Sequence, residues 1–77
     1  MLTSRVFRGR RISVTSIANV SDECDELEFR EEGKSTPIVV VSEQDNSPGD
    51  LFVSIYGQAD AEFVRFAIAA AEEYFSE

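Results

Sequence analysis

The first third of the chain alternates apolar and polar residues with the two-residue period of a β-strand. Val, Ile, Ser and Thr dominate residues 5–20, where Ile12 and Val14 are separated by polar residues. This composition favours an extended strand. Gly9 can mark either a turn or a bulge. The segment therefore forms one bent strand or a hairpin.

Three further strands are predicted before residue 57. Leu27 and Phe29 alternate with charged residues, which indicates a strand with one polar face. Residues 38–41 are four consecutive β-branched residues, a run typical of a strand that is buried on both faces. The sequence Asn-Ser-Pro-Gly at residues 46–49 is a strong turn signal, and residues 51–56 form the last predicted strand.

After Gly57 the hydrophobic period changes from 2 to that of a helix. Residues 59–75 are rich in alanine, with Asp60 and Glu62 at the start, where the helix dipole favours acids. The apolar side of this helix spans roughly 200° of a helical wheel, which is wider than a helix needs to cover a sheet. That apolar arc holds Phe63, Val64, Phe66, Ala67, Ile68, Ala70, Ala71, Tyr74 and Phe75.

The order of these elements predicts an α+β fold. Short connections favour an antiparallel meander of about four strands, with three to five allowed, packed on one C-terminal helix in two layers. Two layers leave one face of the sheet open, and alternation in the last strand places Phe52 and Tyr56 on that face. Exposed apolar patches tend to mark partner surfaces. The alternative is that the first strand curls over the open face and covers it.

Size and composition restrict the classes of protein. Seventy-seven residues, 43% of them hydrophobic, predict a single folded domain over residues 1–77 with a thin core. Cys24 is the one cysteine and there is no histidine, which excludes an intrachain disulfide and the usual zinc sites. We expect no metal and no cofactor. Oligomerisation or a larger partner remains as a source of extra stability.

We expect a cytoplasmic protein without a membrane partner. The longest apolar run, residues 38–41, is far shorter than the roughly 20 residues needed to span a bilayer. Residues 1–20 contain four arginines and no acid, as a targeting peptide would, but they have strand composition.

Charge is distributed unevenly along the chain. Residues 1–21 carry +4, residues 22–32 carry −6 and the remainder carries −6, which together give the net charge of −8. The acidic remainder opposes approach to nucleic acid, so we expect no direct nucleic-acid partner. The arginines at 5, 8, 10 and 11 are instead expected to pair with the acidic strand across the sheet.

The acidic segment, residues 22–32, is the first candidate site. Side chains two apart on a strand lie about 6.7 Å from each other on one face, so Glu26 and Glu28 would present a line of negative charge. Asp22 or Glu32 would extend it. That line suits a phosphate-binding groove on a partner. The alternative is a solvated edge strand, which acids keep soluble and protect from pairing.

The end of the helix is a second acidic patch. Glu72, Glu73 and Glu77 lie where the helix dipole prefers cations, and no lysine offsets them. A cationic partner would explain this placement, and so would a frayed terminus.

Catalytic arrangements are hard to build from this chain. Without histidine there is no Cys–His or Ser–His pair. Cys24 lies between two acids, which disfavour its thiolate. Residues 45–50 lack the spaced ligands of a calcium loop. We expect no enzyme.

These features predict a non-enzymatic binding protein or inhibitor that occludes a basic surface, for example a nucleic-acid-binding one, on a larger protein. In size and charge the chain is similar to small acidic inhibitors encoded by mobile elements, such as nucleic-acid mimics and anti-defence proteins. The alternative is a homodimeric structural or assembly module that pairs through the open sheet face or the helix arc. The candidate contacts are Asp22, Glu23, Asp25, Glu26, Glu28, Glu31, Glu32, Glu72 and Glu73, with Phe52 and Tyr56 as aromatic anchors.

Overall fold

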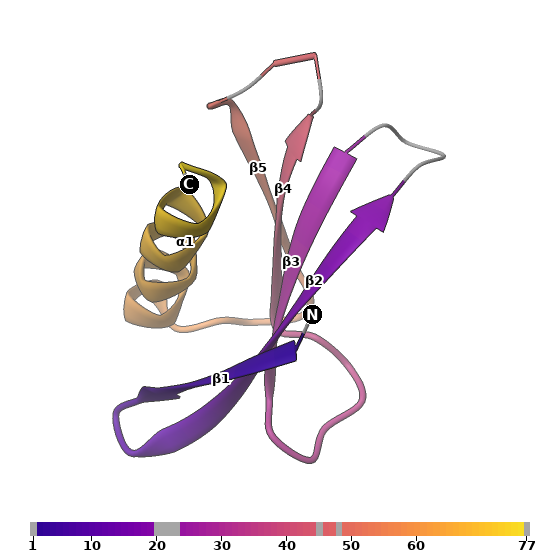
Figure 1. The fold of residues 1–77 in the computed structure, drawn as a ribbon. Coiled ribbons are helices and arrows are strands. Elements are labelled where there is room, and N and C mark those ends of the chain that lie inside the picture. Colours follow the sequence, from indigo (N-terminus) through magenta and orange to yellow (C-terminus); the bar gives the residue numbers. More distant parts are fainter. Residues whose placement is uncertain (1, 20–23, 45, 48, 77) are drawn as a thin grey trace.

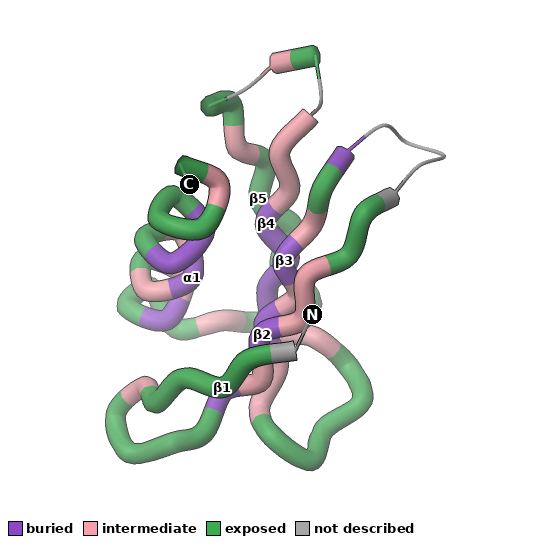
Figure 2. Tube along the Cα trace, viewed as in Figure 1, coloured by how far each residue is buried: buried purple, intermediate pink, exposed green. Residues whose placement is uncertain are grey.

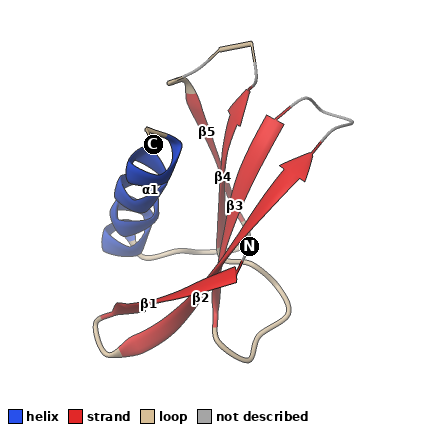
Figure 3. Cartoon of the chain, viewed as in Figure 1, coloured by secondary structure: helices blue, strands red, loops and turns tan. Residues whose placement is uncertain are grey.

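The computed structural model is an antiparallel five-stranded sheet with one helix packed on one of its faces (Figure 1). The structure describes residues 2–19, 24–44, 46–47 and 49–76, and only the backbone of Leu2 and Asn19. This architecture confirms the predicted α+β meander with a C-terminal helix, and the strand number lies within the predicted range (Figure 3). The elements are β1 (Leu2–Phe7), β2 (Arg10–Asn19), β3 (Cys24–Glu31), β4 (Val39–Gln44), β5 (Leu51–Ile55) and α1 (Ala61–Phe75).

The strands lie side by side in chain order, β1-β2-β3-β4-β5, so β1 and β5 form the two edges. Consecutive strands joined by short connections usually pair in this way. The acid-rich strand β3 is consequently in the centre of the sheet. The sequence-based alternative in which acids protect an edge strand is therefore wrong, because two strands precede β3 and two follow it.

Residues 5–20 form a hairpin and not one bent strand. Arg8 and Gly9 have φ angles of 49° and 79°, and they connect the paired residues Phe7 and Arg10. Two successive positive φ angles are what a two-residue turn of type I′ requires, and the twist of that turn matches the twist of the strands. The following strand is long enough to pair with both neighbours, since residues 12–15 face β1 on one side and β3 on the other.

The first strand does not cover the open face of the sheet. Pairing with β2 keeps β1 in the sheet, and Phe7 points to the side of the helix. Its ring centroid lies 5.4 Å from that of Phe63 and 5.1 Å from that of Phe66. The predicted alternative of a covering first strand is therefore wrong, and the face away from α1 has no second layer among the described residues (Figure 2).

The core lies between α1 and the middle of the sheet. Val14, Phe29 and Val39 are directly opposite one another on three neighbouring strands and are buried. Ala67 and Ala71 are fully buried on the helix, and such small side chains let the helix lie close to the strands. The buried cluster consists of Ile12, Val14, Leu27, Phe29, Val39, Val41, Phe63, Ala67, Ala70 and Ala71.

The helix begins two residues later than its hydrophobic period suggests. Asp60 is the N-cap: its backbone is extended, and its carboxylate accepts a hydrogen bond of 3.2 Å from the Phe63 amide. Capping by aspartate satisfies a backbone donor that has no partner within the helix. The cap therefore fixes the first helical residue at Ala61.

Candidate interaction surfaces

Acidic side chains from three elements meet at one end of the molecule. Asp25 lies at the start of β3, Glu43 near the end of β4 and Glu72 in the last turn of α1, and Figure 1 shows these three termini at the same end. Asp25 and Glu43 are directly opposite each other in the ladder. Glu43 and Glu72 line one shallow depression of about 300 Å³. We call Asp25, Glu43 and Glu72 the acidic end.

The fold places these three charges where its own electrostatics disfavour them. Like charges directly opposite each other destabilise an antiparallel pair. The C-terminal end of a helix carries a partial negative charge, and the last turn of α1 contains no basic residue. Glu43 accepts a hydrogen bond of 3.0 Å from the Gly49 amide, which holds its carboxylate in place. Within the described residues, none of the three forms an ion pair.

Two further predicted contacts border the acidic end. Asp25, Glu26 and Tyr74 line a neighbouring open depression. Glu73 lies one residue after Glu72, and its carboxylate is 4.0 Å from the Arg5 guanidinium. The structure thus brings together four predicted contacts from two distant parts of the chain: Asp25, Glu26, Glu72 and Glu73.

Glu43 belongs to the acidic end but is not among the contacts predicted from the sequence. It stands between Ser42 and Gln44, outside both acidic runs, so charge clustering along the chain does not indicate it. The signal that identifies it is the strand register, which pairs it with Asp25.

The other predicted acidic contacts lie elsewhere. Glu28 is on the open face of the sheet and is ion-paired with Arg30, which interrupts the expected line of negative charge from Glu26. Glu31 and Glu32 lie at the opposite end of β3 from Asp25. Asp22, Glu23 and Glu77 lie outside the described residues.

The arginines of the first hairpin only partly follow the prediction. Arg10 reaches Glu31 of the acidic strand at 4.0 Å, whereas Arg8 reaches Asp60 before the helix at 3.9 Å. Arg5 also turns to the helix, as described above. Exposed pairs at this distance contribute about 0–1 kcal/mol each. The register of β2 and β3 therefore depends mainly on buried residues such as Val14 and Phe29.

The predicted aromatic anchors lie on the face of the sheet away from α1. Phe52 is directly opposite Ser42, next to Glu43, so it lies at the same end of the molecule as the acidic end but on the other face. Tyr56 lies beyond the opposite end of β5. These two residues are 54% and 51% exposed. The acids and the two aromatic residues therefore do not form one continuous patch.

The apolar arc of the helix is largely used within the chain. Phe63 is buried, and Phe66 contacts Phe29 with a ring-centroid distance of 6.2 Å. Phe7 covers the part of the arc that a sheet alone would leave open. Tyr74 is the most exposed aromatic residue of the arc. The arc is consequently less available for pairing with a second copy than its width predicts.

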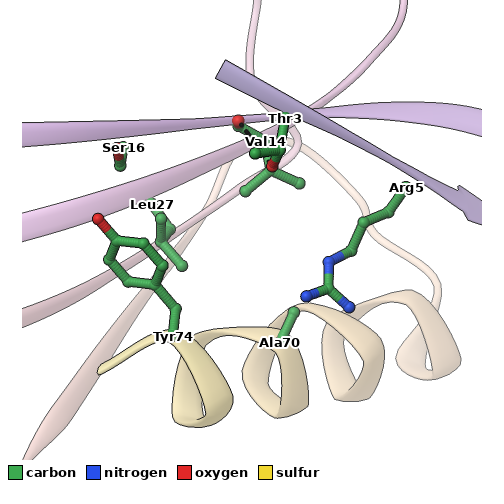
Figure 4. Close-up of a pocket in the computed structure, with 7 residues that line it drawn as sticks. All are labelled: Thr3, Arg5, Val14, Ser16, Leu27, Ala70 and Tyr74. Atoms are coloured by element: carbon green, nitrogen blue, oxygen red, sulfur yellow. Dashed lines mark hydrogen bonds between the residues drawn. The ribbon is translucent and has the colours of Figure 1, made fainter. Parts of the chain in front are cut away.

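A small crevice of about 150 Å³ opens between the first three strands and the helix (Figure 4). Arg5 and Tyr74 lie on either side of an apolar wall in this view, and Arg5 is the charged member of the lining. Because Arg5 already lies near Glu73, an anionic ligand would compete with that carboxylate. Tyr74 is the other titratable side chain of the lining, which includes no carboxylate, histidine or cysteine among the described residues. The lining residues are Thr3, Arg5, Val14, Ser16, Leu27, Ala70 and Tyr74.

Within the described residues, no group of histidine, cysteine, aspartate or glutamate side chains is arranged to hold a metal ion. No helix in the described part of the chain combines the length and the hydrophobicity needed to cross a bilayer. Comparisons with protein-family models, curated proteins and solved structures give no match to this chain.

Proposed function

We propose that the protein is a small non-enzymatic binding protein that occludes a basic surface on a larger protein, with the acidic end as its principal contact. The observation that carries the proposal is the convergence of Asp25, Glu43 and Glu72 from three separate elements. A nucleic-acid-binding groove is the kind of basic surface that such a cluster fits, because its cations are spaced to meet phosphates.

The energetics of the free protein support this proposal. Apposed carboxylates on β3 and β4, and an acid at the helix C-terminus, each cost the folded chain a few tenths of a kcal/mol. Bound cations would remove that cost, so the free energy of binding would include relief of the repulsion. A negative patch also accelerates encounter with a positive one over distances comparable with the Debye length, about 8 Å in physiological salt.

The experiment compares two triple variants of equal charge. The first, Asp25→Asn with Glu43→Gln and Glu72→Gln, neutralises the acidic end. The control neutralises three acids elsewhere, by Glu31→Gln, Glu32→Gln and Glu62→Gln. Both variants change the net charge from −8 to −5. Each tagged protein is used to capture partners from a lysate of the native host at low and high salt, with identification by mass spectrometry.

Each captured protein is then loaded with a labelled oligonucleotide. The unmodified acidic protein is added, and release of the oligonucleotide is measured. We expect a basic protein that is retained by the control variant, lost by the acidic-end variant and released by salt. We also expect the oligonucleotide to be displaced. Equal capture by both variants, or capture that does not change with salt, would refute the proposed contact.

The exposed apolar side chains of β5 favour the second candidate, a homodimeric structural or assembly module. Phe52 and Ile55 in β5, and Tyr56 directly after it, are each about half exposed. Light scattering tests this candidate directly, because a monomer at tens of micromolar would refute it. The two candidates are compatible, since a dimer can also present acidic ends.

A further inference from the structure

The outer edge of β5 is an unpaired strand edge with unusual composition. β5 lies at the end of the sheet, and its pairing with β4 is regular from Leu51 to Ile55. It has no charged residue, no proline and no bulge, which are the usual devices that prevent an edge from pairing with another chain. We propose that two copies of the protein pair antiparallel through this edge, about a two-fold axis at Val53, and so join their sheets.

The hydrogen bonds of β5 show which residues are available. The Tyr56 amide donates a bond of 3.0 Å to the Ile38 carbonyl, so Tyr56 directs its amide toward the β4 side, whereas the Ile38 amide donates to the Phe29 carbonyl. Residues that bond to the same neighbour alternate along an antiparallel ladder, and Ser54 and Phe52 therefore also direct their backbone groups toward β4. The residues whose N–H and C=O groups point outward are Leu51, Val53 and Ile55.

One register uses all of these outward groups. With the axis at Val53, this residue is opposite Val53 of the second copy, and Leu51 is opposite Ile55 of the second copy. Each hydrogen-bonded pair exchanges two bonds, which gives about six bonds across the junction. A shift of the axis by one residue in either direction loses one of the three pairs. The strand therefore favours a single isologous arrangement.

The side chains fit the same register on both faces. On the helix side, Val53 and Ile55 are 39% and 49% exposed although they face α1, because the helix packs over the middle of the sheet. Pairing would place aliphatic residues opposite aliphatic residues there. On the open face, Phe52 would be opposite Ser54 of the second copy. The surface that the single chain leaves exposed is thus the surface that the junction would cover.

Charge favours β5 over the other edge. Two copies that each carry −8 repel each other, so association requires a neutral contact. β5 is neutral, and in the proposed register Asp50 would lie opposite Tyr56 of the second copy rather than opposite an acid. β1, the other edge, carries Arg5 and would bring two arginines into one short ladder.

The test uses the position that faces itself. Val53→Lys and Val53→Glu each place like charges opposite one another at the axis, whereas Val53→Thr keeps a β-branched residue. Multi-angle light scattering from tens to hundreds of micromolar should give twice the chain mass for the unmodified protein and for Val53→Thr. Each charged variant alone should have the mass of one chain, and an equimolar mixture of the two should recover the doubled mass. Added salt should strengthen the unmodified dimer by screening its net charge.

Amide hydrogen exchange provides an independent measurement on the unmodified protein. The amides of Leu51, Val53 and Ile55 should exchange more slowly as concentration rises, while those of Phe52 and Ser54 stay protected throughout. A single-chain mass for the unmodified protein would overturn the proposal. So would persistent dimers of both charged variants, a mixture that stays monomeric, or exchange that does not depend on concentration. The acidic-end variant should still dimerise, so failure here is distinguishable from failure of the proposed occluding function.

Discussion

Replacing Val41 by alanine should destabilise the protein by about 3 kcal/mol, whereas the same replacement at Val6 should cost far less. Both residues are valines in strands, so each variant loses the same two methyl groups. They differ in burial: Val41 is 0% exposed between Leu27 and Val53, and Val6 is 66% exposed near the end of β1.

The magnitude follows from the volume and area removed. Valine to alanine deletes two carbon groups, worth about 1.6 kcal/mol of transfer free energy when fully buried. The space left behind, about 50 Å³, adds roughly 1.2 kcal/mol. Val6 is about one third buried, so its replacement loses about one third of that transfer free energy and leaves no cavity. The expected destabilisation is about 0.5 kcal/mol. The two variants should therefore differ by roughly 2 kcal/mol.

Urea unfolding followed by far-UV circular dichroism measures this difference, at a low micromolar concentration that keeps association out of the transition. A domain of 77 residues has roughly 4 to 12 kcal/mol of stability, so both variants should remain folded in water. With a slope near 1 kcal/mol per molar urea, the midpoints should lie about 2 M apart. Equal midpoints would refute the placement of Val41 in the core and of Val6 outside it.

Three smaller effects follow from the helix ends and the first turn. Asp60→Ala should lower the unfolding free energy by about 1 kcal/mol, whereas Asp60→Asn should keep most of the native stability, because an aspartate carboxylate and an asparagine amide can both cap a helix. Equal melting temperatures for the two variants would contradict the cap. Gly9→Ala should lower the unfolding free energy by about 1 kcal/mol in chemical denaturation, because the φ of 79° at Gly9 is left-handed, and Gly9→Asn should lower it less. An unchanged denaturation midpoint for Gly9→Ala would rule out that turn. Glu72→Lys should stabilise the protein by about 0.3–1 kcal/mol at low salt, and Glu62→Lys should destabilise it by a similar amount. Both effects should shrink in high salt. Changes of the same sign in the unfolding free energies of the two variants would show that the helix dipole is not their cause.

Hydrophobic period was sufficient to predict β3, β4, β5 and α1, and the faces of β4 and β5. The run at residues 38–41 corresponds to a strand that is buried on both faces over residues 39–41, and alternation in residues 51–55 assigns β5 correctly to its two sides. Period could not predict how far the helix extends over those sides. Val53 faces the helix yet remains partly exposed, because one helix is too narrow to cover all five strands.

The hairpin and the acidic end depend on information that local patterns do not contain. Arg8 adopts a left-handed conformation that its residue type does not favour, so the turn was ambiguous beside Gly9. The opposition of Asp25 and Glu43 exists only once the register of β3 and β4 is known. Counting charges along the chain therefore identified Asp25 and Glu72 of the acidic end and missed Glu43.

The order of elements along the chain has a consequence for synthesis on the ribosome. All five strands precede α1, whose buried residues begin at Phe63 and end at Ala71. A nascent chain can therefore form its hairpins early, but its apolar sheet face stays in water until the helix has left the exit tunnel. Until then the same face and the unpaired β5 edge are open to other chains, so the helix segment, which is translated after all five strands, determines whether the sheet folds or associates.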